Sequence, residues 1–195
     1  ELNKLYLEVI IANEFDNNAL KILKAKKNLR LIDGKKYKLD EIIKFKSFNQ
    51  NILVQSEDLN FFSKKNFKIV SKRKPSSKQL KDLIFAFNVC RYVKSNAIVL
   101  ASNETTVGIG SGQPSRLDSC QIAIDKMKKF NLKTDNLVAA SDAFFPFLDG
   151  IEKLVQSGVR AIVQPSGSIR DKEIINYANE TDTVLLFSKT RHFRH

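Results

Sequence analysis

Three short apolar runs near the end of the chain alternate with segments of helical spacing, and this alternation restricts the fold strongly. The runs cover residues 137–140, 159–163 and 183–187. Strands that are joined through helices are parallel and require right-handed crossover connections. We therefore predict an α/β fold in three layers, with a parallel sheet in the second half of the chain.

A proline marks the start of this α/β part. Pro75 follows a basic run and is expected to end the element before it, so we place a domain boundary between residues 74 and 75. Ser76 and Gln79 form a capping-box pattern, which predicts a helix through about residue 93. This helix is apolar around most of its circumference, as is typical of a helix buried between layers.

A hairpin and a second helix are expected next. Residues 97–101 and 105–109 are rich in β-forming residues and flank a short polar segment, which predicts a hairpin at the sheet edge. Glycines at 108, 110 and 112 have GxGxG spacing, a weak sign of a dinucleotide loop. Two interpretations stay open for them: a tight turn that leads into a helix at residues 115–129, or close approach to a ligand.

The first part of the chain gives fewer signals, and residues 35–72 are the hardest to interpret. The expected elements are a buried strand at residues 7–12, a helix at 18–27, a strand at 29–32, a turn at Asp33 and Gly34, and strands at 52–54 and 67–70.

The net charge of +12 raises the question of a nucleic-acid partner. The lysines are spread along the chain and are densest in the first 75 residues, and no RNP motif or zinc knuckle accompanies them. We expect a lysine-rich solvated face and no nucleic-acid partner. A basic nucleic-acid-binding module is kept as the alternative, as is a structural fragment that serves only in dimerisation.

Composition also limits metal sites and membrane segments. Cys90 and Cys120 lie in helical segments with apolar neighbours, and the sequence has no CxxC or HExxH pattern, so we expect buried thiols and no metal site. No apolar run approaches the roughly 20 residues that span a bilayer, and the start lacks the layout of a signal peptide. The expected location is therefore the cytoplasm, with no membrane partner.

Each of the three apolar runs is followed by a loop that is rich in aromatic, charged or small residues. Loops that leave the carboxyl ends of parallel strands form the ligand crevice of such a sheet. Residues 141–149, 164–168 and 191–195 are therefore predicted to surround one ligand.

The first of these loops contains Phe144, Phe145 and Phe147, which cannot all face one core. Pro146 fits the first turn of the following helix, and Asp149 then lies near the positive end of that helix. Two interpretations are equally supported. The loop is either an aromatic core plug or an apolar slot for an aromatic ring, in which Asp149 accepts hydrogen bonds from a ring amide and amine.

The other two loops also allow two interpretations each. Ser168 is a candidate N-cap, so its loop either caps a helix or admits an anion to the exposed N–H groups. The tail at residues 191–195 is either solvated or brings Arg191 and Phe193 beside the phenylalanine loop. There an arginine grips a phosphate or carboxylate while a phenylalanine covers a heterocycle.

Five blocks of sequence carry a resemblance to a known family. They are Lys94-Ser-Asn-Ala-Ile98, Val107-Gly-Ile-Gly-Ser-Gly-Gln-Pro-Ser-Arg116, Ser141-Asp-Ala-Phe-Phe-Pro-Phe147, Gln164-Pro-Ser-Gly-Ser-Ile-Arg-Asp171 and Arg191-His-Phe-Arg-His195. In this order they resemble the bifunctional purine-biosynthesis family that joins AICAR transformylase to IMP cyclohydrolase. Residues 8–12 and 19–23 fit as well, so the resemblance covers essentially the whole chain.

The resemblance implies a reaction, a fold and an assembly. The reaction is formyl transfer from 10-formyltetrahydrofolate to the 5-amino group of AICAR, giving FAICAR and tetrahydrofolate in de novo purine (IMP) biosynthesis. The fold is a pair of zinc-free cytidine-deaminase-like units, of which residues 75–195 are the complete second one and residues 1–74 the remainder of the first. A homodimer with the site at its interface and a structural monovalent cation are also implied.

The resemblance also implies roles for single residues. It makes Asn96 the catalytic residue, a hydrogen-bond donor to the transition state near the formyl group. The implied AICAR-binding residues are Glu8, Phe144, Arg191 and Phe193. The implied folate-binding residues are Leu117, Pro146, Phe147 and Asp149, with Asp149 against the edge of the pterin.

The sequence departs from the family pattern in two ways. Leu148 replaces an arginine that is common directly before this aspartate. The family's Lys-His pair for proton transfer, its AICAR phosphate ligands and the cyclohydrolase domain all lie upstream of the matching region. We therefore expect a fragment of a larger enzyme that shows no turnover by itself.

Overall fold

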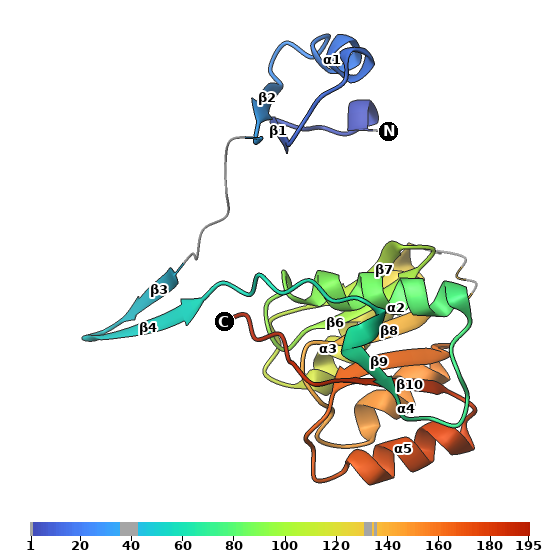
Figure 1. The fold of residues 1–195 in the computed structure, drawn as a ribbon. Helices are drawn as coiled ribbons and strands as arrows, with labels where there is room; N and C mark the ends of the chain where they lie inside the picture. Colours follow the sequence, from blue (N-terminus) through green and yellow to red (C-terminus); the bar gives the residue numbers. More distant parts are fainter. Residues whose placement is uncertain (1, 36–42, 131–133, 135) are drawn as a thin grey trace. The chain divides into compact units, whose positions relative to one another are not determined.

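The chain divides into two compact units, Glu1–Glu57 and Asp58–His195, and each is described by itself (Figure 1). The computed structural model describes residues 2–35, 43–130, 134 and 136–195. The boundary between the units lies upstream of the 74/75 boundary predicted from Pro75. The reason is that the strand at Phe67–Ile69 belongs to the sheet of the second unit.

The first unit contains a strand–helix–strand motif and a separate hairpin. Its described elements are η1 (Leu2–Lys4), β1 (Val9–Ala12), α1 (Asn17–Leu23), β2 (Arg30–Asp33), β3 (Ile43–Phe48) and β4 (Asn51–Ser56). β1 and β2 are parallel, and β3 and β4 are antiparallel. Asp16 caps α1, since its side chain accepts a hydrogen bond of 2.7 Å from the N–H of Ala19.

The expectation of a buried strand at residues 7–12 is wrong in this unit. The side chains of Val9 and Ile11 in β1 are 44% and 67% exposed. Among the described residues, β1 pairs only with β2, and a two-stranded sheet with one short helix has too few layers to bury both faces. The predicted helix is also shorter than expected, because α1 ends at Leu23. Part of the segment at 35–72 lies outside the described residues.

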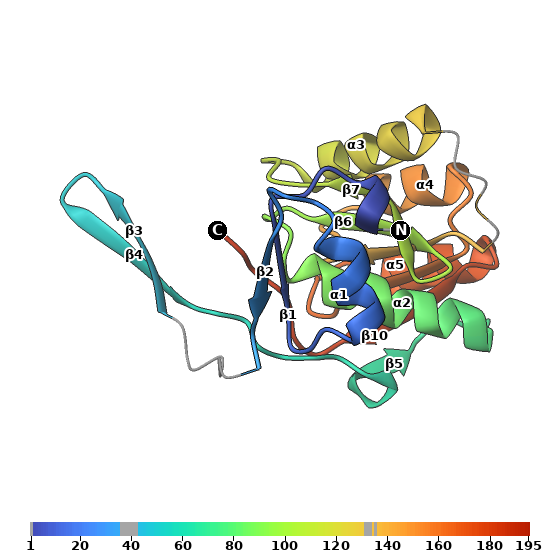
Figure 2. The same ribbon diagram turned by 90° about the horizontal axis from the view of Figure 1, so that it is seen from above.

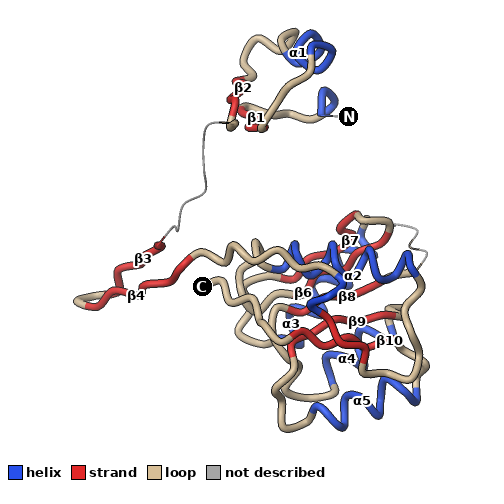
Figure 3. Tube along the Cα trace, in the orientation of Figure 1, coloured by secondary structure: helices blue, strands red, loops and turns tan. Residues whose placement is uncertain are grey.

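In the part of the second unit that the structure describes, a mixed sheet is accompanied by four α-helices, and the elements can be followed in Figure 3. They are η2 (Lys64–Asn66), β5 (Phe67–Ile69), α2 (Ser77–Cys90), β6 (Ile98–Ser102), β7 (Thr105–Gly110), α3 (Arg116–Lys129), β8 (Val138–Ser141), α4 (Asp149–Gln156), β9 (Ala161–Pro165), α5 (Asp171–Glu180) and β10 (Val184–Ser188). The strand order among the described residues is β5-β10-β9-β8-β6-β7.

The pairing in this sheet confirms the predicted α/β class. β8, β9 and β10 are parallel neighbours, as the alternation of strands and helices requires. β6 and β7 form the predicted antiparallel hairpin at one edge, and β5 runs antiparallel to β10 at the other. The capping box that begins α2 is also confirmed. Ser76 Oγ accepts from the N–H of Gln79, and Gln79 Oε1 accepts from the N–H of Ser76.

The strands bury alternate residues on two faces, so the second unit has three layers. Ile98 and Leu100 pack with α3, α4 and α5 in one core cluster. Val99 and Ala101 pack with α2 in the other. Figure 2 shows α2 on one side of the sheet and α3 and α4 on the opposite side. No helix in the described part of the chain has the length and apolar character that a membrane span requires.

Two glycines of the GxGxG pattern serve the packing of a helix on the sheet. Gly108 and Gly110 lie within β7, and methyl groups at these positions would overlap the carbonyl oxygens of Ala123 and Ser119 in α3. Close approach of backbone is a common reason for glycine in a strand. Here the glycines bring α3 against β7, so neither interpretation made from the sequence describes them. Gly112, with a φ of +69°, forms the turn that follows.

Candidate functional site

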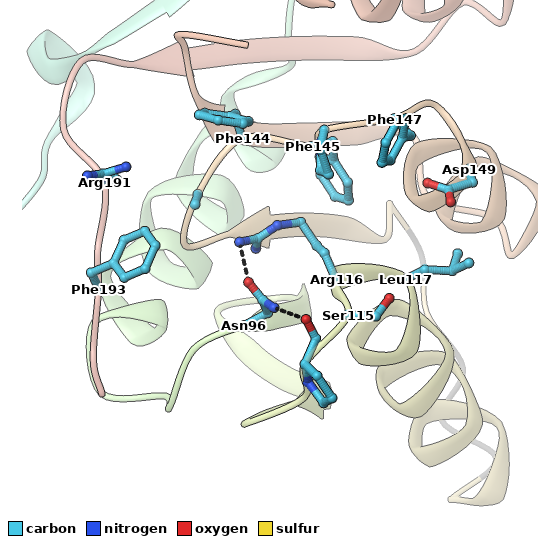
Figure 4. Close-up of a pocket in the computed structure, with 13 residues that line it drawn as sticks. Asn96, Ser115, Arg116, Leu117, Phe144, Phe145, Phe147, Asp149, Arg191 and Phe193 are labelled. Carbon is cyan, nitrogen blue, oxygen red and sulfur yellow. Dashed lines mark hydrogen bonds between the residues drawn. The ribbon is translucent and has the colours of Figure 1, made fainter. Parts of the chain in front are cut away.

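A cavity of about 390 Å³ opens in the second unit and is lined by nearly all of the predicted site residues (Figure 4). Those that line it are Asn96, Leu117, Phe144, Pro146, Phe147, Asp149, Arg191 and Phe193. Ser115, Arg116 and Phe145 are further lining residues. The cavity therefore brings together residues that are almost a hundred positions apart in the sequence.

Sheet topology explains this convergence. Ile98, the first residue of β6, pairs with Ser141 at the end of β8 and with Gly110 at the end of β7. Asn96, which precedes β6, therefore lies at the same end of the strands as the loops that follow β7 and β8. β10 runs parallel to β9 and β9 to β8, so the tail after Ser188 leaves at the same edge. The carboxyl-end crevice predicted from the sequence is thus present.

The loop after β8 combines the two interpretations made of it. Phe145 is a core residue, 1% exposed, and its N–H donates to Gln164 Oε1 at 3.0 Å. Phe144 is half-buried and Phe147 is 54% exposed, and both line the cavity. One phenylalanine therefore anchors the loop in the core, and the other two supply an apolar wall.

The start of α4 places a carboxylate at the end of this wall. α4 begins at Asp149, so Pro146 precedes the helix and does not occupy its first turn as predicted. Asp149 does lie in the first turn, and its Oδ1 accepts from the N–H of Gly150 at 2.7 Å. A carboxylate at this end of a helix is favoured by the helix dipole. The side chain is exposed at the cavity and can accept further hydrogen bonds.

Asn96 is half-buried, and its side-chain amide is held by three hydrogen bonds. Its Nδ2 donates to the carbonyl oxygens of Gln113 (2.9 Å) and Pro114 (3.1 Å). Its Oδ1 accepts from Arg116 Nη2 at 2.8 Å. A guanidinium can only donate, so the amide oxygen must face Arg116. The orientation of the Asn96 amide at the cavity is therefore fixed.

Arg116 is a cavity residue to which the sequence argument gave no role. It is 8% exposed and forms an ion pair with the buried Asp142, and its Nη1 also donates to Ser141 Oγ at 2.8 Å. These partners satisfy a charge that would otherwise be costly to bury. One signal could have revealed it. Arg116 directly follows the N-cap Ser115, where the helix dipole disfavours a cation.

The C-terminal tail is held in place, so the interpretation of a solvated tail is wrong. The N–H of His192 donates to the carbonyl of Asp142 at 2.9 Å, and the N–H of Ser95 donates to the carbonyl of Arg194 at 3.0 Å. Arg191 and Phe193 both line the cavity, and Arg191 Cζ lies 4.7 Å from the centroid of the Phe193 ring.

Three loops were predicted to surround the ligand, and the loop at residues 164–168 is the one that does not line the cavity. Its contribution is indirect, through the hydrogen bond from Phe145 to Gln164. Ser168 is not an N-cap, because α5 begins at Asp171 and Ser168 Oγ accepts from the N–H of Arg170. Asp171 instead accepts from the N–H groups of Gly167 and Ser168, which folds the loop back on the helix.

Glu8, the remaining predicted residue, belongs to the first unit. It is exposed directly before β1, and its carbonyl accepts from the N–H of Arg30 at 2.9 Å. Its assignment to a binding site stays a prediction.

The two thiols lie in the core of the second unit. Burial raises the pKa of Cys120 to about 12. The pKa of Cys90 is raised well above its usual value, mainly by burial and to a smaller extent by the negative charge of Asp142. Within the described ranges, no group of three or more His, Cys, Asp and Glu side chains is arranged to hold a metal ion.

Comparisons with known proteins identify the family of the chain. The family described as the AICARFT/IMPCHase bienzyme matches residues 1–126. Similar proteins, each named bifunctional purine biosynthesis protein PurH, occur in Buchnera aphidicola subsp. Schizaphis graminum (48% identical), Persephonella marina (44%) and Aquifex aeolicus (42%). The alignments cover all of this chain and 37%, 38% and 38% of these relatives, so the chain spans a little over a third of their length. The chain therefore belongs to the AICARFT/IMPCHase bienzyme family.

Proposed function

We propose that the Asp58–His195 unit binds AICAR and 10-formyltetrahydrofolate in this cavity. The full-length protein would transfer the formyl group to the 5-amino group of AICAR and would also carry IMP cyclohydrolase activity. Membership of the family and a role in purine biosynthesis, as the relatives' names state, support the proposal. The chain's own residues supply the chemical argument.

The observation that carries the proposal is the position of Asn96 between two groups of lining residues. In Figure 4, Arg191 and Phe193 lie on one side, and Leu117, Phe147 and Asp149 lie on the other. Asn96 lies between them. The first group suits a charged heterocyclic nucleotide, because arginine grips anionic groups and phenylalanine covers a ring.

The second group suits a pterin. Leu117, Pro146 and Phe147 form an apolar wall, and Asp149 provides acceptors at its end. A fused ring with an adjacent amide and amine presents the donors that a carboxylate accepts side by side. The formyl group would then stand between the two ligands, beside Asn96.

The reaction needs stabilisation of one developing negative charge. The amine nitrogen of AICAR attacks the formyl carbon, the bond from that carbon to the folate nitrogen breaks, and the amine proton ends on the folate nitrogen. The formyl oxygen carries negative charge in the transition state, and a positioned N–H stabilises it. We assign this role to Asn96 Nδ2. The 3.1 Å bond to the carbonyl of Pro114 is exposed and is the longer of its two, so it is the one to be exchanged for the formyl oxygen.

The proposal extends to the fold, the assembly and the proton transfer. Residues 75–195 would be a zinc-free cytidine-deaminase-like unit, which the three layers and the parallel β8–β10 strands support. The full-length protein would form a homodimer. Proton transfer would use the Lys-His pair expected upstream.

Paired substitutions in the full-length protein test the two ends of the cavity separately. Arg191→Gln should raise the KM for AICAR about tenfold, and Asp149→Asn should raise the KM for the folate by a similar factor, the scale of one lost charge-assisted hydrogen bond. Each should leave the KM of the other substrate within about twofold.

The Arg73–Asp182 ion pair offers matched controls, since both residues lie in the second unit and outside the cavity lining. Arg73→Gln and Asp182→Asn are the same two types of substitution at residues outside the cavity, and both KM values should stay unchanged. A folate KM that is unaffected by Asp149→Asn would show that the aromatic loop is only structural.

A further inference from the structure

The C-terminal tail has no regular secondary structure, yet it carries two residues of the cavity. Burial alternates along it, because Arg191 is exposed, His192 is 1% exposed and Phe193 is 37% exposed. Successive side chains of an extended segment point to opposite sides. The segment that presents Arg191 and Phe193 to the cavity therefore sends His192 into the protein.

His192 enters a buried environment that is mostly aromatic. Its Nδ1 lies 2.5 Å from Asp58 Oδ2. Its ring packs against Phe62 and Phe87, with centroid distances of 4.9 and 4.5 Å. An Nδ1–H donated to the carboxylate is the tautomer that fits this contact. The Nε2 atom is buried and has no hydrogen-bond partner among the described residues, so Asp58 is what orients the ring.

Asp58 itself belongs to a segment that is tied to α2. The N–H of Phe62 donates to Asn88 Oδ1 at 2.8 Å, and Asn88 Nδ2 donates to the carbonyl of Phe62 at 2.9 Å. Arg91 Nη1 donates to the carbonyl of Asn60 at 2.8 Å. The contact between His192 and Asp58 therefore links the tail to a segment 134 positions earlier in the sequence, and that segment is itself tied to α2.

We propose that His192, held by Asp58, is a positioning residue for the AICAR end of the cavity. A chain end frays unless it is tied down, and a hydrogen bond to a carboxylate is among the stronger ties. The pair would hold Arg191 and Phe193 at the distance from Asn96 that the reaction requires. This inference rests on the proposed function of the cavity.

Binding measurements on the full-length protein test this role with AICAR and 10-formyltetrahydrofolate, each added alone. His192→Leu removes the hydrogen bond and keeps an apolar side chain in the core. It should raise the Kd for AICAR about tenfold, the scale of one charge-assisted hydrogen bond lost when Arg191 is displaced. The Kd for the folate should stay within about twofold, because Asp149 and Phe147 belong to a different loop.

Three further variants separate positioning from folding. His192→Asn keeps an N–H donor close to the position of Nδ1, and it should recover most of the AICAR affinity. Asp58→Ala removes the carboxylate that accepts from His192, and this side chain is 24% exposed, so less packing is lost than at His192. It should raise the Kd for AICAR by a similar factor, and it keeps the test possible if His192→Leu does not fold. Ile174→Ala is the control for lost stability, since this residue is buried in the other core cluster. It should lower the melting temperature and leave both Kd values unchanged.

The outcomes distinguish this inference from the proposed function. If wild-type protein binds both ligands, His192→Leu and Asp58→Ala weaken the binding of AICAR alone, and His192→Asn recovers most of it, the positioning role is supported. If His192→Leu and Asp58→Ala bind AICAR as wild type does, or weaken the binding of both ligands equally, the positioning role is overturned and the proposed function stands. If wild-type protein binds neither ligand, the proposed function itself fails.

Discussion

At the scale of single residues, the chemistry that we propose for the cavity depends on the side-chain amide of Asn96. Arg116 donates to its oxygen, and the carbonyls of Gln113 and Pro114 accept from its nitrogen. Arg116 is in turn fixed by Asp142, which also accepts from Ser95 Oγ at 2.5 Å. A donor that is oriented before the substrate arrives needs little reorganisation in the transition state, which is the basis of electrostatic catalysis.

Removal of this donor should reduce turnover far more than binding. In the full-length protein, Asn96→Ala is expected to lower kcat by about 10²-fold, the scale of losing one donor to an oxyanion. Gln113→Ala is the matched control, because it keeps the backbone carbonyl that accepts from Asn96. Steady-state formylation kinetics measure both. A loss in kcat of less than about threefold would contradict the role given to Asn96.

The buried thiols give a second prediction at this scale. Burial raises the pKa of Cys120 to about 12 and raises that of Cys90 as well, so almost no thiolate is present near neutral pH. We expect maleimide labelling of the native 195-residue chain at pH 8 to be slow and labelling in denaturant to be fast. The raised pKa of Cys120 favours the protonated, folded form, so its contribution to stability is complete below the unfolded value near 9 and is lost as the pH rises toward 12. Rapid labelling of the native protein would show that the thiols are accessible.

At the scale of elements, the contact between α3 and β7 sets the position of Arg116 and Leu117. Both residues lie in the first turn of α3, and the cavity depends on how closely this helix approaches the sheet. Gly108 and Gly110 allow that approach because neither has a side chain between β7 and the backbone of α3.

A methyl group at the contact between α3 and β7 should therefore lower the stability of the protein. Gly110→Ala is expected to lower the free energy of unfolding by about 2–3 kcal/mol, the upper part of the usual range for overpacking. Gly34→Ala is the control, since a Cβ there would make an ordinary contact of 3.4 Å with Ile11. Urea denaturation of the two variants gives the comparison. Equal stability of both would mean that α3 can shift without cost.

The sequence predicted the elements of the second unit well, because local chemistry specifies them. The capping box at Ser76 begins α2, and the apolar runs before the loops become β8, β9 and β10. Local signals are weaker at the starts of α4 and α5. Pro146 and Ser168 have residue types that suit a helix start, but Asp149 and Asp171 begin the helices instead.

Contacts between distant segments could not be predicted from one sequence. The burial of His192 depends on Asp58, and the burial of Arg116 depends on Asp142. Residue type alone makes a terminal histidine and a helical arginine look solvent-exposed. The exposed β1 is the opposite case, because its apolar residues meet too few layers in the first unit to be buried.

At the scale of the whole molecule, the site residues lie together because several strands of the sheet begin or end at the same side. The hairpin β6–β7 runs antiparallel to β8, so the beginning of β6 and the ends of β7, β8 and β10 lie together. The net charge of +12 is carried mainly by lysines along the chain, whereas the cavity contains Arg116 and Arg191. This distribution favours a small anionic substrate at the cavity over a polynucleotide along a continuous groove.

The most direct measurement is a crystal structure of the full-length protein with AICAR and an unreactive analogue of 10-formyltetrahydrofolate bound together. The account predicts AICAR against Phe144, Arg191 and Phe193, with the pterin hydrogen-bonded to Asp149. It also predicts the formyl-equivalent oxygen about 3 Å from Asn96 Nδ2, within hydrogen-bond distance. Ligands bound away from this cavity, or a formyl-equivalent oxygen out of reach of Asn96, would contradict it.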